Sequence, residues 1–179
     1  SKGAYTFIEG RRENLDKVLS EQLLKLCTEA LMRDGAQTAD IAGKRYLVQT
    51  LSPAPRLFLI GAVHIAQKLA PMARLAGYEV LLFDPRSAFA SVERFPDVQI
   101  INDWPHEVMK SFILDSRSAV VTLSHDAKID EPAIMAALDS DAFYIGALGS
   151  KKNHMKRLER LADRGFDAIT LSRVYGPVG

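Results

Sequence analysis

A turn between an apolar run and a helical pattern holds the first residues that could do chemistry. It reads Gly61-Ala62-Val63-His64-Ile65-Ala66, and its backbone amides would open a helix whose N-terminus favours an anion. Gly61 permits the tight turn, and Ala66 is small enough for close contact between helix and strand. The turn therefore predicts a ligand-binding loop at Gly61, Ala62, Val63 and His64.

Two charged residues follow the next apolar run, about 20 residues after the turn. Asp84 stands where dinucleotide-binding folds place the acid that binds ribose hydroxyls, and Arg86 could hold a phosphate beside it. The alternative is a strand-end turn, with Arg86 in solvent. Val63 argues against ordinary dinucleotide binding, because a β-branched residue resists positive φ and puts a side chain where a pyrophosphate would lie.

A third loop carries His125 and Asp126, which could donate to a ligand or act as acid and base. The alternative is that Asp126 only caps a helix. A fourth loop contains Gly146, Gly149 and Ser150, and we favour phosphate binding at its last two residues. The basic helix that follows carries Lys156, Arg157 and Arg160, most of which we expect on a solvated face.

The elements that must position these loops alternate along the chain. Strands are predicted at 56–61, 78–83, 98–101, 118–123 and 142–146, and helices at 64–76, 104–114, 131–139 and 150–164. The alternation predicts an α/β fold, a Rossmann-like doubly wound parallel sheet in which the strand at 56–61 is central. Ligands bind beyond the carboxyl ends of such strands, so all four loops should meet at one edge.

An N-terminal helix and strand extension is predicted over residues 1–54, before the Rossmann domain at 55–179. It comprises an arm over 1–13, an amphipathic helix from Asn14 to Arg33 and a strand from Arg45 to Leu51. The apolar stripe of this helix needs a partner surface, and we expect a homodimer; the alternative is packing within the chain. The stripe consists of Leu15, Val18, Leu19, Leu23, Leu26, Cys27, Ala30 and Leu31.

Composition narrows the function. The 179 residues carry a net charge of +1, so nothing favours nucleic acid or an anionic membrane, and no apolar run is long enough for a membrane span. The single cysteine fits a reducing compartment, and we expect a cytoplasmic protein. The sequence has no zinc-type Cys/His spacing, no Walker loop and no Gly-x-Ser-x-Gly elbow, so neither a metal site nor a catalytic set is predicted.

Three segments together resemble the XdhC/CoxI family, the xanthine dehydrogenase accessory factors. They cover the strand and turn at 55–66, the stretch 120–126 with Asp130 and Pro132 after it, and the stretch 140–152. Val63 stands where the family has its second glycine.

The resemblance implies a protein that binds molybdenum cofactor, a pterin with a phosphate and a dithiolene, and is not itself a catalyst. It implies delivery to the apoenzyme of a molybdenum hydroxylase of the xanthine or carbon monoxide dehydrogenase type, with cofactor-supplying proteins as further partners. The family positions present here are Gly61, Ala62, His64, Asp84, Arg86, His125, Asp126, Gly146, Gly149 and Ser150. Two alternatives stay open: an NAD(P)-binding oxidoreductase, and a non-catalytic dimeric interaction module with a degenerate nucleotide site.

Overall fold

The structure, a computed structural model, describes residues 21–33 and 35–178. The chain divides into two compact units, and the boundary lies between Pro53 and Ala54. The proposed arm over 1–13 and the helix start at Asn14 lie outside the described residues.

The first unit is a helix packed on a hairpin. Helix α2 (Glu21–Arg33) buries Leu26, Cys27 and Ala30, and it contacts β1 (Ala36–Ile41) and β2 (Lys44–Gln49). The two strands pair antiparallel through a two-residue turn, in which Ala42 and Gly43 both have positive φ. Strand β2 was predicted from the sequence, but β1 was not, because its residues alternate only weakly between apolar and polar.

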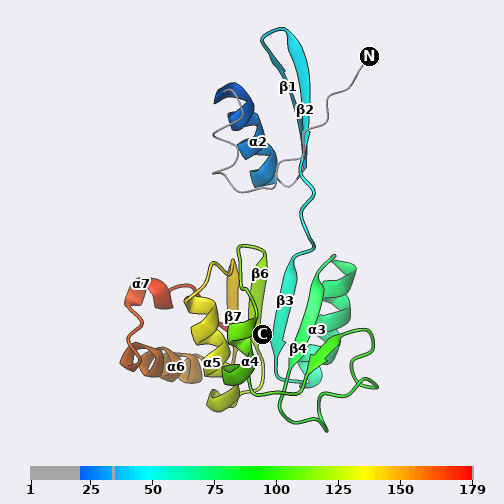
Figure 1. The fold of residues 1–179 in the computed structure, drawn as a ribbon. Helices are drawn as coiled ribbons and strands as arrows, with labels where there is room; N and C mark the ends of the chain where they lie inside the picture. Colours follow the sequence, from blue (N-terminus) through cyan, green and yellow to red (C-terminus); the bar gives the residue numbers. More distant parts are fainter. Residues whose placement is uncertain (1–20, 34, 179) are drawn as a thin grey trace. The chain divides into compact units, whose positions relative to one another are not determined.

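The second unit is the α/β domain that the alternation predicts (Figure 1). Its six strands are all parallel and run in the order β5-β4-β3-β6-β7-β8. Their bounds are β3 (Arg56–Ile60), β4 (Glu79–Phe83), β5 (Gln99–Ile101), β6 (Ser118–Thr122), β7 (Tyr144–Leu148) and β8 (Val174–Val178). As predicted, β3 is central, and Asp84 directly follows the neighbouring strand β4.

Helices cover both faces of this sheet, and side chains alternate between them along each strand. Helix α3 (His64–Leu75) packs on one face, where Leu57 and Leu59 point. Phe58 and Ile60 point to the other face, which is covered by α5 (Ala127–Leu138), α6 (Lys151–Asp163) and the short helices α4 (Pro105–Val108), η1 (Met109–Ser111) and α7 (Ala168–Leu171).

Several predicted bounds were wrong. Helix α5 begins at Ala127 rather than 131, because the Asp126 carboxylate accepts a hydrogen bond from the Lys128 amide at 2.9 Å and caps it. The predicted helix over 104–114 is one α-helical turn and one 3-10 turn. It ends where Phe112 turns into the core against Phe58 and Phe83.

The last strand was missed by the sequence analysis, and it is held by an arginine. Arg173 precedes β8 and donates hydrogen bonds of 2.8, 2.8 and 3.0 Å to the carbonyls of Leu138, Ser140 and Ala142. These carbonyls lie at the end of α5 and in the turn before β7, so Arg173 ties the edge strand to the preceding helix and strand.

Candidate functional site

The predicted loops after β3 and β6 meet at the carboxyl edge of the sheet. Gly61 has φ of +106°, and a Cβ built on it would lie 2.7 Å from the Ser124 amide nitrogen. Only glycine satisfies both the backbone angle and this close approach. Gly61 therefore brings the first turn against the loop that holds His125 and Asp126.

Asp84 is bound to the chain's own donors. It is 0% exposed, and its Oδ2 accepts from the Ala62 amide at 2.8 Å and from Arg86 Nη2 at 2.7 Å. Its Oδ1 accepts from the Arg86 amide and Nε at 3.0 and 2.8 Å. Burial alone would raise the pKa of Asp84, but these hydrogen bonds and the Arg86 charge outweigh it and lower the pKa. Both oxygens that could bind a ribose are thus engaged.

Arg86 extends this pair toward the surface. Its side chain is 40% exposed, and its guanidinium lies 4.8 Å from the ring centroid of Phe89. The hydrogen bond to Asp84 raises the pKa of Arg86, and the charges of Asp126 and Asp130 act in the same direction. Arg86 is therefore attracted both by Asp84 after β4 and by the acids that follow β6, Asp126 and Asp130.

The backbone conformation of Val63 differs from the one expected from the sequence. Its φ is −90° and its ψ is 175°, an extended conformation at the start of α3, so positive φ is not required there. The expected backbone conflict with a β-branched residue was therefore wrong. The Val63 side chain is half-buried against the core on the sheet face that α3 covers. The neighbouring His64 is exposed, and its Nδ1 lies 3.0 Å from Gln67 Oε1.

The loop after β6 is built around Asp130. Its Oδ1 accepts from the Ser124 hydroxyl at 2.6 Å and from the Ser124 amide at 3.2 Å. His125 has φ of +63°, a left-handed conformation that histidine adopts more readily than most residues, and its exposed side chain faces a pocket. Asp126 does cap α5, as the alternative interpretation held, although whether it also binds a ligand stays a prediction.

The three residues predicted for the loop after β7 have different positions: Gly146 lies inside the strand, whereas Gly149 and Ser150 follow it. Gly146 lies inside the strand, where a Cβ would come within 2.8 Å of the Tyr144 ring, so its position is explained by packing. Gly149 follows the strand with φ of +145° and approaches Asn153 and Arg157. The Ser150 hydroxyl accepts from the Asn153 amide at 3.2 Å and caps α6.

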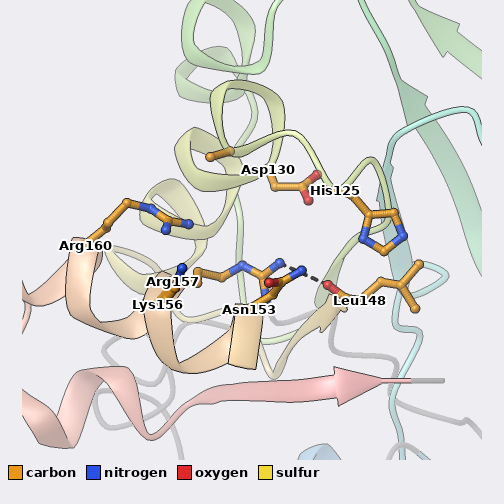
Figure 2. Close-up of a pocket in the computed structure, with 8 residues that line it drawn as sticks. His125, Asp130, Leu148, Asn153, Lys156, Arg157 and Arg160 are labelled. Carbon is orange, nitrogen blue, oxygen red and sulfur yellow. Dashed lines mark hydrogen bonds between the residues drawn. The ribbon is translucent and has the colours of Figure 1, made fainter. Parts of the chain in front are cut away.

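A pocket of about 210 Å³ opens between α5 and α6 at this edge (Figure 2). Asp130 lies on the α5 side, and Arg157 lies opposite it on α6, where its Nη2 donates to the Leu148 carbonyl at 3.0 Å. The lining residues are His125, Ala127, Asp130, Leu148, Asn153, Lys156, Arg157 and Arg160. The pocket combines basic side chains of α6 with one buried acid.

Asp130 and Arg157 are the unusual residues of the pocket. They are 1% and 6% exposed, and Asp130 Oδ2 and Arg157 Nη1 have no hydrogen-bond partner in the part of the chain that the structure describes. Burial raises the pKa of Asp130, against the opposing effects of the Ser124 hydrogen bonds and the Arg157 charge. Burial likewise lowers the pKa of Arg157, although Asp130 and Glu131 oppose the shift.

Neither Asp130 nor Arg157 was predicted from the sequence to line a pocket. Most basic residues of α6 were expected on a solvated face, and Arg157 is an exception, because it lies on the inner stripe of α6 with His154 and Leu161. Asp130 likewise shares the buried face of α5 with Ala133 and Ala137. A charged residue at helical spacing within an apolar stripe was the available signal in both cases.

Arg160 is held differently. Its Nε and Nη2 both lie 2.6 Å from Glu131 Oε1, and Arg164 Nη2 lies 3.8 Å from Glu131 Oε2. Arg160 is thus already paired, whereas Lys156 is exposed at the pocket. Across residues 21–33 and 35–178, no group of three or more His, Cys, Asp or Glu side chains could hold a metal ion. In the same ranges no helix has the length and apolar character needed to cross a membrane.

The strand order, the glycine turn and the pocket at the carboxyl edge define a Rossmann-type α/β domain. The model of the XdhC Rossmann domain matches residues 57–179, and the chain belongs to that family, as the resemblance indicated.

Curated relatives agree. The chain is 31% identical over 127 residues to the molybdenum cofactor insertion chaperone PaoD of Escherichia coli, covering 71% of this chain and 34% of PaoD. It is 33% identical over 112 residues to a Bacillus subtilis protein named as a probable xanthine dehydrogenase subunit, covering 62% of this chain and 34% of that protein. The chain thus spans about a third of the length of these relatives.

One solved structure is similar in fold as well as in sequence. A crystal structure of a xanthine dehydrogenase from Bacillus halodurans matches with a TM-score of 0.62 and 26% identity. The match covers 75% of this chain and 39% of that one.

Proposed function

We propose that this protein binds molybdenum cofactor at the carboxyl edge of the β3–β6–β7 sheet and delivers it to a molybdenum hydroxylase of the xanthine or carbon monoxide dehydrogenase type. The observation that carries the proposal is the pocket between α5 and α6 in a chain of this family. It holds a buried acid and a buried arginine, each of which keeps one polar atom without a hydrogen-bond partner among the described residues. The relative PaoD is named as a chaperone for inserting this cofactor.

The chemistry of the cofactor suits this edge. A phosphate is favoured at the start of a helix and beside cations, and α3 and α6 both begin here, with Lys156 on α6. The heterocycle offers N–H and carbonyl groups for polar side chains. The loop residues proposed to lie near the ligand are Gly61, Ala62, Val63, His64, His125, Asp126, Gly149 and Ser150. Asp84, paired with Arg86, holds the first turn through the Ala62 amide.

The proposed role is carriage rather than catalysis, in a cytoplasmic setting and with the apoenzyme and cofactor-supplying proteins as partners. The rival function is an NAD(P)-dependent oxidoreductase. Two contacts disfavour it. Asp84 engages both of its oxygens internally, and the Gly61 and Ala62 amides already donate to Phe83 O and Asp84. A pyrophosphate and a ribose would have to replace these hydrogen bonds.

The test is retention of the cofactor. The purified chain is incubated anaerobically with molybdenum cofactor released from a molybdenum enzyme, and the molybdenum and pterin that co-elute with it are measured. We expect stoichiometric co-elution at micromolar protein. A parallel titration with NADH and NADPH serves the rival: tight dinucleotide binding without cofactor retention would reverse the assignment.

A further inference from the structure

The pocket between α5 and α6 leaves one acceptor and one donor without partners. Asp130 Oδ2 and Arg157 Nη1 are both buried, and within the described residues neither makes a hydrogen bond. Unpaired charged groups in such positions are costly, so their presence calls for a species that satisfies both. Figure 2 shows the two side chains on the two sides of the pocket.

The rest of each side chain is fixed. Asp130 Oδ1 is held by the amide and hydroxyl of Ser124, and Arg157 Nη2 is held by the Leu148 carbonyl. These contacts leave one carboxylate oxygen and one guanidinium nitrogen, both on side chains that line the pocket, without a partner among the described residues. The ligand edge that matches them carries an N–H for the carboxylate and, next to it, a carbonyl for the guanidinium.

We infer that this pocket binds the lactam edge of a pterin ring, with Asp130 accepting from the ring N–H and Arg157 donating to the ring carbonyl. The inference rests on the proposed function, since it assigns one part of the cofactor to one pocket. It orients the ligand with its heterocycle between α5 and α6. The phosphate then lies next to the ring, toward the helix starts and Lys156 of the pocket lining.

Size and charge favour this ligand over others. A volume of about 210 Å³ is below the roughly 300–1,000 Å³ of sites that enclose whole ligands, so the pocket fits one ring system rather than a nucleotide. A phosphate would satisfy Arg157 but would set like charges beside Asp130. Burial raises the pKa of Asp130, in spite of the Ser124 hydrogen bonds to Oδ1, and Oδ2 has no donor among the described residues.

The experiment uses the whole chain and follows pterin fluorescence on titration. Pterin should bind, and 3-methylpterin, which lacks the ring N–H, should bind at least roughly tenfold more weakly, as loss of a charge-assisted hydrogen bond predicts. Guanosine carries the same edge on a purine but adds a ribose, so it should bind more weakly than pterin. This comparison needs no substitution and stands even where variants fold poorly.

Three variants locate the contact. Asp130→Asn and Arg157→Lys should each weaken pterin binding roughly tenfold or more. Asp139→Asn, an exposed acid at the other end of α5, is the matched control and should bind pterin as the unaltered chain does. Urea unfolding followed by tryptophan fluorescence checks that each variant is folded.

The outcomes separate the inference from the proposed function. Equal affinity for pterin and 3-methylpterin, no pterin binding at millimolar concentration, or tighter binding of guanosine would overturn the inference, even where the chain retains the complete cofactor. Binding of inorganic phosphate that survives Arg157→Lys, without pterin binding, would make the pocket an anion site and also overturn it. Selective pterin binding without cofactor retention would support the pocket assignment and refute carriage.

Discussion

Replacing Gly61 with alanine tests the contact on which the site's geometry depends. The new Cβ would lie 2.7 Å from the Ser124 nitrogen and 2.9 Å from both Cα and Cβ of Ser124, distances that require one of the two loops to move. The backbone at φ of +106° adds strain for any L side chain. We expect Gly61→Ala to lower the free energy of unfolding by roughly 2–5 kcal/mol in all. The backbone strain accounts for about 1–2 kcal/mol of this loss and the forced overpacking for about 1–3 kcal/mol.

Gly77 provides the matched control. It follows α3 with φ of +86°, and a Cβ there would meet nothing within 4 Å. Gly77→Ala should therefore cost only the strain, about 1–2 kcal/mol. The difference between the two variants isolates the clash between the loops after β3 and β6.

Urea denaturation measures both costs. The chain has a single tryptophan, Trp104, which lies in the α/β unit just before α4, so its fluorescence reports the unfolding of that unit. With a slope of roughly 2 kcal/mol per M, Gly61→Ala should lower the midpoint by about 1–2.5 M and Gly77→Ala by about 0.5–1 M. Equal losses in the two variants would refute the close approach of Gly61 to Ser124.

Three further predictions concern the first turn and the N-terminal unit. Val63→Gly alone should not create NADH affinity in a calorimetric titration, because the amides of Gly61 and Ala62 already have acceptors; a micromolar affinity would show that the Val63 side chain was the obstacle. Arg86→Ala should lower the free energy of unfolding at pH 7 by about 1–3 kcal/mol. This loss is smaller than that expected for a fully buried ion pair, because the Arg86 side chain is 40% exposed. Arg86 lowers the folded pKa of Asp84, so this contribution is complete above the ordinary value of 3.8 and is lost as the pH falls from there through the folded pKa. In the variant the folded pKa moves back up, so an acid titration should show a smaller loss of stability over this range. The intact chain should sediment as a homodimer and a chain beginning at Pro53 as a monomer, since the N-terminal unit exposes Met32 of α2, Leu47 of β2 and Leu51 after it. A monomeric intact chain contradicts the expectation.

The fold could be predicted because its signals are local and repeated. Continuous apolar runs bounded by turns predicted the inner strands, and the glycine turn predicted the start of α3 at the carboxyl end of β3. Strand β1 and the edge strand β8 were missed since neither has such a run. Strand β8 also contains Gly176 and Pro177, residues that usually argue against a strand.

The site was predicted by position but not by contact. The sequence indicates that Asp84 ends a strand, yet it cannot show that the Arg86 fork and the Ala62 amide occupy the carboxylate. That pairing depends on the packing of the loop after β3 against the loop after β4. Most basic residues of α6 were expected in solvent because basic residues on a helix usually lie there, and only the packing of α6 on the sheet reveals that Arg157 is buried.

Arg173 has a consequence for the order in which the domain is completed. The Leu138 carbonyl belongs to the last turn of α5, where no helical donor remains, and Arg173 supplies one from far along the chain. During synthesis, the carbonyls at the end of α5 and in the turn before β7 therefore lack their arginine donor until Arg173 has been made. A nascent chain that stops short of this arginine lacks both the edge strand β8 and the donor that fixes the turn between α5 and β7.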